Sequence, residues 1–557
     1  MTEARPDIVG RHRRLVSRTV LVSALTLVSR ILGYARESLM AALFGHQSAV
    51  LDAFITAWRV PNLFRRLLGE GALSTSLQTR LTEVDSDLGI ECGRALLART
   101  LQITSWILVA VCLVVMAVAN LIPDPLPIVG WHVLGTDPAA VRELTTRLMP
   151  FVVLVCISAQ TSGALQVRGE FKVSSLAPAV LNVVWVATLV AFLWRDGWPQ
   201  AASSMARSGE LQMMRVLSWA VLVAGILQLL VQVPMLRRHG FLRFGSEPSG
   251  SAAFDVGGNA RKVLRASAPL ALGAAVYQFN VMIDGLMAQG MLTKGGPGAY
   301  YFATRVQHFP IALIALSATS AIFPSLKALG HLGRKQELRD LHDRAQAGVL
   351  FLAMPAAFGL IAMAGPICAL LFQHGRYAAE GVERTALTLM TLSFAILPAG
   401  AVSLTSRAYF ALNDFAGPVR VSIAMVVVNV ALNLLFVGVL DLDAAGFAAS
   451  TALCAWINIG LLWPGLCRRL GLPATRLGLP GRCARVAIAS AASAGLARGV
   501  YSLILGQAPS NGSWALVAMG TGVILAVAAY LALARILGLE EGRALLARLR
   551  GPESPAR

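Results

Sequence analysis

The chain has 557 residues, of which 56% are hydrophobic and 14% charged, whereas soluble domains carry about 25% charged residues. This composition excludes a water-soluble globular protein. The apolar runs recur without polar domains between them, so we expect one polytopic membrane unit. The net charge of +19 requires no nucleic-acid partner, because basic residues of membrane proteins collect in cytoplasmic loops.

Apolar segments follow one another along the chain, and each is long enough for a bilayer core, which takes about 20 residues per helix. They predict an all-α membrane protein with about fourteen transmembrane helices. The predicted ranges are 19–44, 50–69, 95–121, 145–167, 174–194, 213–235, 266–290, 299–326, 346–373, 386–411, 418–440, 444–466, 484–505 and 513–537. The first, second, eighth and tenth ranges contain charges and give the weakest hydropathy signals.

Positive charge alternates between the loops of this arrangement. The N-terminal segment 1–18 and the segment 237–265 are rich in arginine, whereas the loop 506–512 has no charged residue. Because arginine and lysine stay on the cytoplasmic side, we expect both termini in the cytoplasm. No cleavage pattern precedes the first helix, so we expect that helix to be retained. The seven cysteines form no CxxC motif and are expected to be reduced packing residues.

A weak internal repeat has an offset of roughly 240 residues and aligns Arg65 with Arg305. It predicts two six-helix lobes around a central cavity, with two further helices at the C-terminal end. The predicted parts are a cytoplasmic segment 1–18, an N-lobe 19–236, a cytoplasmic linker 237–265, a C-lobe 266–466, a cytoplasmic loop 467–483, a helix pair 484–537 and a cytoplasmic tail 538–557.

Several arginines fall well inside predicted helices, where a charge costs a few kcal/mol and is normally paired or functional. Arg30 and Arg36 lie in the first helix, and Glu37 follows Arg30 by seven residues on the same face. Two interpretations are open: a structural ion pair between Arg30 and Glu37, or arginine side chains that face a ligand. We favour the second.

The second and eighth helices add to this set of charges. Asp52, Arg59 and Arg66 recur at intervals of seven, while Arg65 points elsewhere and Arg305 occupies the equivalent place in the second half. Guanidinium groups grip phosphate oxygens in a bidentate fork. We therefore predict an anionic ligand, most simply a diphosphate, bound by Arg30, Arg36, Asp52, Arg65 and Arg305.

A second group of residues offers hard oxygen ligands. Asp284 lies in the seventh helix, Asn429 and Asn433 share a face of the eleventh, and Thr451 lies in the twelfth. Carboxylate, amide and hydroxyl oxygens suit a small cation such as Na⁺. Hydrogen bonds between helices explain the asparagines and the threonine equally well, so both interpretations stay open.

No enzyme signature occurs: the sequence has no P-loop, no HExxH and no GxSxG. We therefore expect a protein that is not an enzyme and has no cofactor, except for a Na⁺ coupling ion. His308 and His374 are expected to make local polar contacts.

Several motifs together resemble, in order and spacing, the MurJ (MviN) family of lipid II flippases. They are Ser29–Glu37, Phe44–Gly45, Asp52–Phe54, Val60–Arg66, Gly69–Ala72, Arg168–Phe171, Ala177–Asn182, Phe309–Pro310 and Arg407–Asp414. The resemblance implies the fold of the multidrug/oligosaccharidyl-lipid/polysaccharide exporter superfamily, with a lipid-facing groove at the last two helices. It also implies a substrate, the undecaprenyl-diphosphate-linked peptidoglycan precursor, which moves from the cytoplasmic to the periplasmic leaflet of the bacterial inner membrane.

The resemblance also assigns roles to residues of this chain. Arg30, Arg36 and Arg305 match essential cavity arginines, and Glu70 matches an acidic position that, with Glu37, is expected to gate the site or pair with arginine. Asp284, Asn429 and Asn433 match Na⁺ positions of some members, although Asn429 is an amide where an acid is common. His308 replaces an acid that some relatives have after the eighth-helix arginine.

These observations predict a flippase that works by alternating access, with membrane lipids and cell-wall synthesis proteins as partners and a monomeric state. One alternative is an exporter of another polyprenyl-diphosphate-linked oligosaccharide. Another is a membrane scaffold that does not transport, which would not need to keep the buried charges.

Overall fold

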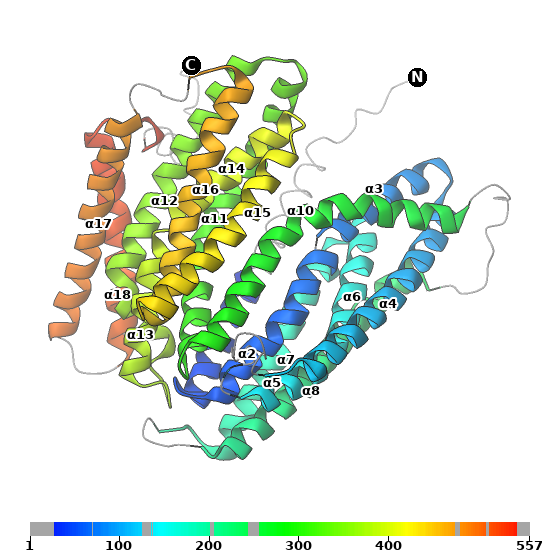
Figure 1. Cartoon of the computed structure of the whole chain (residues 1–557), viewed down its shortest axis with the longest axis horizontal. Coiled ribbons are helices and arrows are strands. Elements are labelled where there is room, and N and C mark those ends of the chain that lie inside the picture. The colour runs from blue at the N-terminus through cyan, green and yellow to red at the C-terminus, as the bar shows by residue number, and fades with distance from the viewer. Residues whose placement is uncertain are drawn as a thin grey trace, which may run out of the picture. The chain divides into compact units, whose positions relative to one another are not determined.

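The protein is described by a computed structural model that covers residues 27–69, 71–124, 135, 137–200, 205–242, 255–473, 479–507 and 512–542. Helices make up most of these residues, and no strand occurs among them (Figure 1). The described residues divide into two compact units. The first unit runs up to Gly290 and also includes His374–Tyr377, and the second unit contains the rest.

The helices of the first unit begin with one over residues 27–44. It is followed by α2 (Ala49–Phe64), the π-helix η1 (Arg65–Gly69), α3 (Ala72–Asp87), α4 (Ile90–Leu121), α5 (Pro138–Leu148), α6 (Pro150–Val167), α7 (Phe171–Asp196), α8 (Arg207–Leu230), α9 (Val233–Arg238) and α10 (Val256–Met291).

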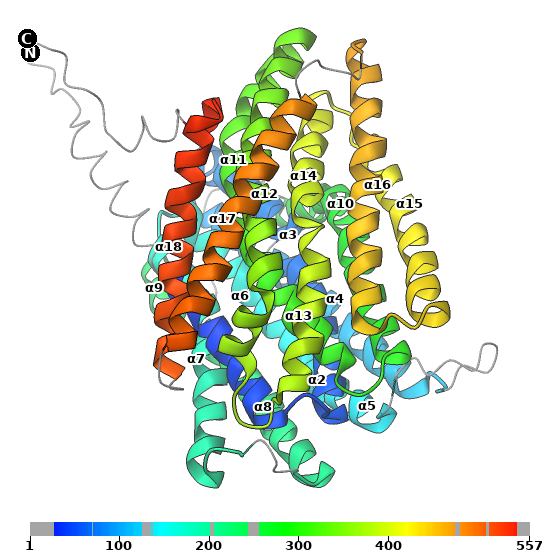
Figure 2. The same ribbon diagram turned by 90° about the vertical axis from the view of Figure 1, so that its left-hand side faces the viewer.

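The helices of the second unit are α11 (Gly296–His331), α12 (Lys335–Phe372), α13 (Ala379–Ser393), α14 (Ile396–Ala411), α15 (Ala416–Asn433), the π-helix η2 (Leu434–Val439), α16 (Asp443–Leu470), α17 (Leu479–Gln507) and α18 (Gly512–Ile536). The last two form a closely packed pair, and α17 packs against α12 (Figure 2).

Each of the fourteen predicted ranges falls mainly on helix where it is described, with short breaks inside three of them, at Met149, 231–232 and 394–395. Nine helical segments of the described chain are long and apolar enough to cross a membrane, and the pair α13 and α14, bent by 41°, would make a tenth. The predicted helical membrane fold is therefore confirmed. The segments that fall short correspond to the first, second, seventh and eighth ranges, and a crossing at all fourteen stays a prediction.

The predicted domain limits stay predictions as well. The seventh predicted helix, 266–290, was assigned to the C-lobe, whereas α10 belongs to the first compact unit up to Gly290. One contact that holds it there is a buried hydrogen bond of 2.9 Å from the Thr56 hydroxyl of α2 to Gln289 of α10.

Helix α3 was not among the predicted helices, and its pattern explains why. Leu73, Leu77, Leu81 and Val84 recur every three or four residues and are buried, while much of the opposite face is polar. This amphipathic stripe packs into a core shared with α4, α6, α9 and the start of α10. A search for continuous apolar segments passes over such a helix.

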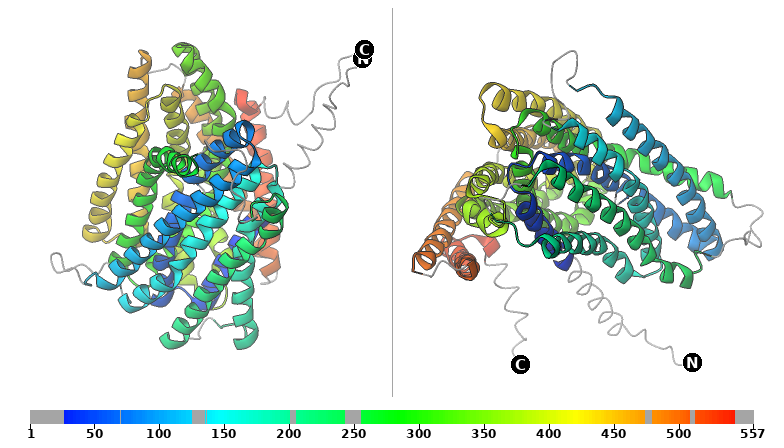
Figure 3. Two further views of the ribbon diagram at one scale, coloured as in Figure 1. Left: turned by 90° about the vertical axis from the view of Figure 1, so that its right-hand side faces the viewer. Right: turned by 90° about the horizontal axis from the view of Figure 1, so that it is seen from below.

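The C-terminal helix pair belongs to the second unit through a separate small core. Val486 and Ala489 of α17 and Tyr530 and Ala534 of α18 are buried against α12. The Tyr530 hydroxyl donates a hydrogen bond of 2.6 Å to the carbonyl of Phe351 on α12. Figure 3 shows this pair, in orange and red, at one edge of its unit. Its other surface carries exposed apolar side chains, such as Leu503, Leu516 and Ile524, as expected for a lipid-facing helix pair.

Candidate functional site

Arg36 is the most deeply buried of the predicted arginines in the first unit, and it is 7% exposed. Its guanidinium forms an ion pair of 2.5 Å with Glu37 and donates a hydrogen bond of 3.1 Å to the Asn182 side-chain oxygen on α7. Its Cζ atom lies 4.5 Å from the ring centre of Trp185, one helical turn further along α7. Arg36 is thus held by a carboxylate, an amide and an aromatic face at once.

Asn182 also connects α7 to the first helix in a second way. Its amide nitrogen donates a bond of 3.0 Å to the backbone carbonyl of Ser29. A Cβ at Gly33 would lie 4.0 Å from that nitrogen, an ordinary van der Waals distance, so this approach of α7 to the first helix does not require a glycine. Arg30 lies half-buried on the same helix. The sequence suggested a structural ion pair between Arg30 and Glu37. The structure forms an ion pair between Arg36 and Glu37.

The second helix brings its polar residues against α10. Asp52 is 2% exposed, and the Arg59 side chain crosses α10 at Gly285, where a Cβ would lie 2.3 Å from the Arg59 Nη1 atom. A larger residue at Gly285 would require the Arg59 side chain to move. Asp284 is the residue directly before Gly285 in α10.

Arg65 opens the π-helix η1, a type of turn that is frequent at functional sites. It is half-buried and donates a bond of 3.0 Å to the side-chain oxygen of Asn62, one turn earlier. Glu70, the predicted gating partner, lies outside the described residues.

In the second unit, Arg305 of α11 donates a hydrogen bond of 2.9 Å to the Tyr301 hydroxyl. Its Cζ atom lies 4.9 Å from the centre of the same ring. His308 contacts the carbonyl of Thr304 at 2.6 Å. Each unit thus holds one predicted arginine over an aromatic ring, Arg36 over Trp185 and Arg305 over Tyr301.

The predicted Na⁺ ligands are divided between the two units. Asn433 donates a bond of 2.7 Å to the Asn429 oxygen, and Thr451 donates one of 3.0 Å to the Phe447 carbonyl, all in the second unit. Asp284 belongs to the first. No group of three or more His, Cys, Asp or Glu residues that could hold a metal occurs in the described part of the chain.

These contacts test how well the residues fit Na⁺. The buried Asn429 amide nitrogen has no hydrogen-bond partner, and a cation cannot satisfy an N–H donor. The Asn429 oxygen already accepts from Asn433. A cation at the Asn429 oxygen would compete with the Asn433 amide, and the Na⁺ site stays a prediction.

At two carboxylates near helix ends, burial and a neighbouring arginine shift the pKa in opposite directions. At the end of α3, burial raises the pKa of Asp85 above its usual value, although Arg168 lies 2.7 Å away and acts in the opposite direction. Before α5, burial likewise opposes ionisation of Asp137. Two hydrogen bonds of 2.7 Å from Arg207 and one from the Ala140 N–H outweigh it and hold the pKa of Asp137 below its usual value.

Residues next to the arginines were missed by the sequence analysis. Trp185 and Tyr301 had no assigned role, and Asn182 appeared only within a family motif. The available signal was spacing: Trp185 follows Asn182 by three residues and Tyr301 precedes Arg305 by four, which places each pair on one helix face.

The helical fold, with Arg36 buried in the first unit and Arg305 half-buried in the second, defines the class: it is the fold of a polytopic membrane transporter, shared with two solved structures. A solved MATE family transporter of the multidrug/oligosaccharidyl-lipid/polysaccharide exporter (MOP) superfamily matches with a TM-score of 0.63 at 12% identity, covering 81% of this chain and 98% of its own. A solved lipid II flippase MurJ in an inward closed conformation matches with a TM-score of 0.69 at 19% identity, covering 93% and 99%.

The particular family follows from the sequence comparisons. The family model described as lipid II flippase MurJ matches residues 40–520, so the chain belongs to the MurJ family. The lipid II flippase MurJ of Burkholderia cenocepacia is 29% identical over 80% of this chain and 83% of its own. The probable lipid II flippase MurJ of Bdellovibrio bacteriovorus is 29% identical over 98% of each chain.

Proposed function

We propose that this protein moves lipid II, the polyprenyl-diphosphate-linked peptidoglycan precursor, from the cytoplasmic to the periplasmic leaflet of the bacterial inner membrane. The observation that carries the proposal is the family match over residues 40–520, which includes helices of both units. The protein would act as a transporter and not as an enzyme, with both termini in the cytoplasm. The proposal includes a monomeric state and cell-wall synthesis proteins as partners.

The contacts of Arg36 support a role in binding the diphosphate. Glu37 is the anion that this guanidinium holds in the absence of substrate, and a diphosphate offers oxygens of the same kind with more charge. Asn182 and Trp185 keep the guanidinium in place during the exchange. Release then needs only that Glu37 returns, so substrate and carboxylate compete for one cation.

Arg30, Arg65 and Arg305 would provide further phosphate or sugar contacts, with Asp52 as a polar partner. Arg305 is oriented by Tyr301 as Arg36 is by Trp185. Alternating exposure of the cavity to the two sides would then carry the head group across, while the lipid tail stays in the bilayer along α17 and α18. Coupling to Na⁺ through Asp284, Asn429, Asn433 and Thr451 is a separate proposal, to be tested by comparing transport with Na⁺ and K⁺.

A leaflet-accessibility assay of lipid II tests the proposal. Bacteria depleted of their own flippase would carry the chain unchanged, or with Arg30→Ala, Arg36→Ala or Arg305→Ala, at matched expression. Arg195→Ala is the control, because Arg195 is an exposed arginine paired with Asp196 at the end of α7.

We expect outward exposure of lipid II with the unchanged chain and the Arg195 variant, and its loss with the other three. Failure of the unchanged, correctly inserted chain would refute lipid II as substrate and favour another polyprenyl-diphosphate-linked oligosaccharide.

A further inference from the structure

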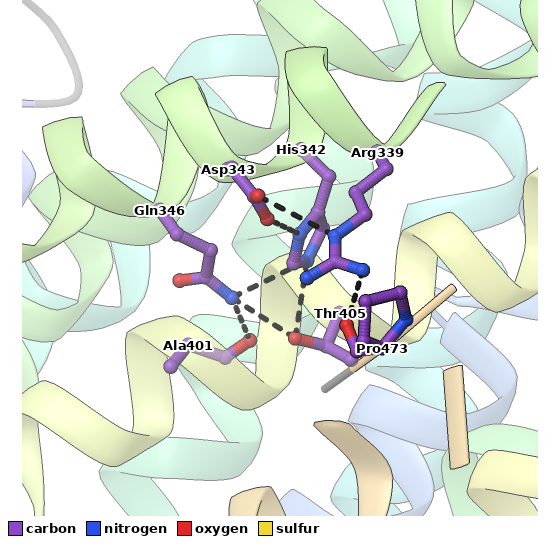
Figure 4. Close-up of polar contacts among 7 residues, drawn as sticks. All are labelled: Arg339, His342, Asp343, Gln346, Ala401, Thr405 and Pro473. Carbon is purple, nitrogen blue, oxygen red and sulfur yellow. Dashed lines mark hydrogen bonds and ion pairs between the residues drawn. The ribbon is translucent and has the colours of Figure 1, made fainter. Parts of the chain in front are cut away.

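A buried polar cluster in the second unit lies outside the set of arginines discussed above. Its members are Arg339, His342, Asp343 and Gln346 of α12, Thr405 and the Ala401 carbonyl of α14, and the Pro473 carbonyl beyond α16 (Figure 4). His342 is completely buried and Arg339 is 3% exposed. Ionisable groups buried within a membrane bundle are costly and usually functional.

Gln346 and Thr405 link helix α12 to helix α14 through hydrogen bonds. The Gln346 amide nitrogen donates to the Ala401 carbonyl at 3.0 Å and to the Thr405 hydroxyl oxygen at 2.9 Å. The same nitrogen also lies 3.4 Å from His342 Nε2, but the two shorter bonds use both of its N–H groups. The Thr405 oxygen lies 3.3 Å from His342 Nε2, so its own proton points to that nitrogen.

The other side of the histidine faces the acid. His342 Nδ1 lies 3.4 Å from an Asp343 oxygen, and the second Asp343 oxygen lies 3.6 Å from Arg339 Nε. Arg339 also donates to the Pro473 carbonyl at 2.5 Å. This arrangement fits the tautomer that donates from Nδ1 to Asp343 and accepts at Nε2.

We propose that His342 is a proton-binding site that couples the ionisation of α12 to its contact with α14. A proton that arrives at Nε2 uses the lone pair that now accepts from Thr405. The resulting imidazolium keeps its Nδ1–H bond to the Asp343 carboxylate and stacks on Trp463, at a centroid distance of 5.3 Å. The carboxylate and the aromatic ring face the imidazole on these two sides.

Protonation has a consequence for the helix contact. Nε2 becomes a donor, so the Thr405 oxygen must accept from it, and the Thr405 hydroxyl proton needs another acceptor. The acceptor within reach of a helical threonine is the carbonyl four residues earlier, which is that of Ala401. This carbonyl already accepts from Gln346 and from its own helix. Thr405 and Gln346 then compete, and the bond from α12 to α14 weakens.

The charges around His342 allow this change. Arg339 and Asp343 come from α12, and Cys467 of α16 lies within electrostatic range of both. The groups that α14 presents to the histidine, Thr405 and the Ala401 carbonyl, are uncharged. The Asp343 side chain keeps 10% of its surface exposed, so it provides a route by which a proton reaches the buried ring.

The site is tested by hydrogen exchange of the full chain in lipid nanodiscs at pH 7.5 and pH 5.5, after correction for intrinsic exchange rates. We expect acid to lower the protection of the α14 backbone near residues 401–405 by about fivefold, the effect of one hydrogen bond. His342→Asn and Thr405→Val should each remove this pH effect. The control is His331→Asn, an exposed histidine at the end of α11.

An unchanged chain without the acid effect would overturn the proposal, as would His342→Asn with the effect intact. The role in transport rests on the proposed function and has its own measurement, the rate of lipid II movement in proteoliposomes with and without a pH difference. Loss of gradient sensitivity in His342→Asn, with movement retained at equal pH, supports coupling. If neither the unchanged chain nor any variant moves lipid II, but acid still lowers the hydrogen-exchange protection of α14, the flippase proposal fails and the proposal of a proton-binding site is retained.

Discussion

Two buried arginines of this protein each contact one carboxylate and one tryptophan, but the distances to these partners differ. Arg36 has Glu37 and Trp185, and Arg339 has Asp343 and Trp463. The Arg36 ion pair is 2.5 Å long, whereas that of Arg339 is 3.6 Å long and its carboxylate is also bonded to His342. The same building blocks thus make a fixed cation in one unit and, with a histidine added, a group that responds to protons in the other.

The largest expected effect is that of Arg36→Ala. It leaves Glu37 buried without its cation, and breaking such a pair costs about 3–5 kcal/mol. Unfolding in detergent measures this loss. The double variant Arg36→Ala with Glu37→Gln should recover much of the stability but no transport. A double variant as unstable as the single one would show that the arginine acts through packing and not through charge.

Asp343→Asn should cost less, about 1–3 kcal/mol, because the Arg339 pair is longer and Arg339 keeps its bond to Pro473. The same unfolding measurement compares the two variants directly. A loss equal to that of Arg36→Ala would contradict the distinction between a tight pair and a shared carboxylate.

The aromatic contacts should differ in the same direction. Arg36 lies 4.5 Å from the Trp185 ring centre and Arg339 lies 5.5 Å from that of Trp463. Double-mutant cycles with arginine to glutamine and tryptophan to leucine should give a coupling of about 1–2 kcal/mol for the first pair and a smaller one for the second. Equal couplings would mean that the ring distance has no influence here.

The smallest effect concerns a pair outside the membrane, Asp137 with Arg207. Because the folded pKa of Asp137 lies below its usual 3.8, the pair stabilises the fold above that pH. The stabilisation is lost as pH falls through the lower folded value. Arg207 is largely exposed, so Arg207→Ala should cost no more than about 1 kcal/mol at pH 7. The variant and the unchanged chain should converge in acid unfolding curves below pH 3.8; a constant difference would exclude this pair as its cause.

The sequence predicted the helices and several buried charges, but not how those charges pair. Glu37 shares a helix face with Arg30, whereas side chains of consecutive residues such as Arg36 normally diverge. The structure forms the pair between neighbours because Arg36 also reaches Asn182 and Trp185 on α7, which turns its guanidinium sideways. Spacing along one helix cannot foresee a contact that a second helix imposes.

Other parts were beyond prediction for related reasons. Helix α3 has too few consecutive apolar residues to register in a search for membrane spans, although its leucine stripe was present. The cluster around His342 joins α12 to α14 and to the Pro473 carbonyl, at separations of about 60 and 130 residues in sequence. The Na⁺ site, predicted from oxygen chemistry and from family likeness, stays a prediction.

The charged early helices also bear on how the chain enters the membrane during synthesis. The helical segment formed by α2 and η1 carries Arg59, Arg65 and Arg66 and does not qualify as an apolar span, whereas α4 does. A translocon that reads apolarity therefore receives a weaker signal from α2 and η1 than from α4. We expect α2 and η1 to enter the bilayer together with later helices that shield their arginines.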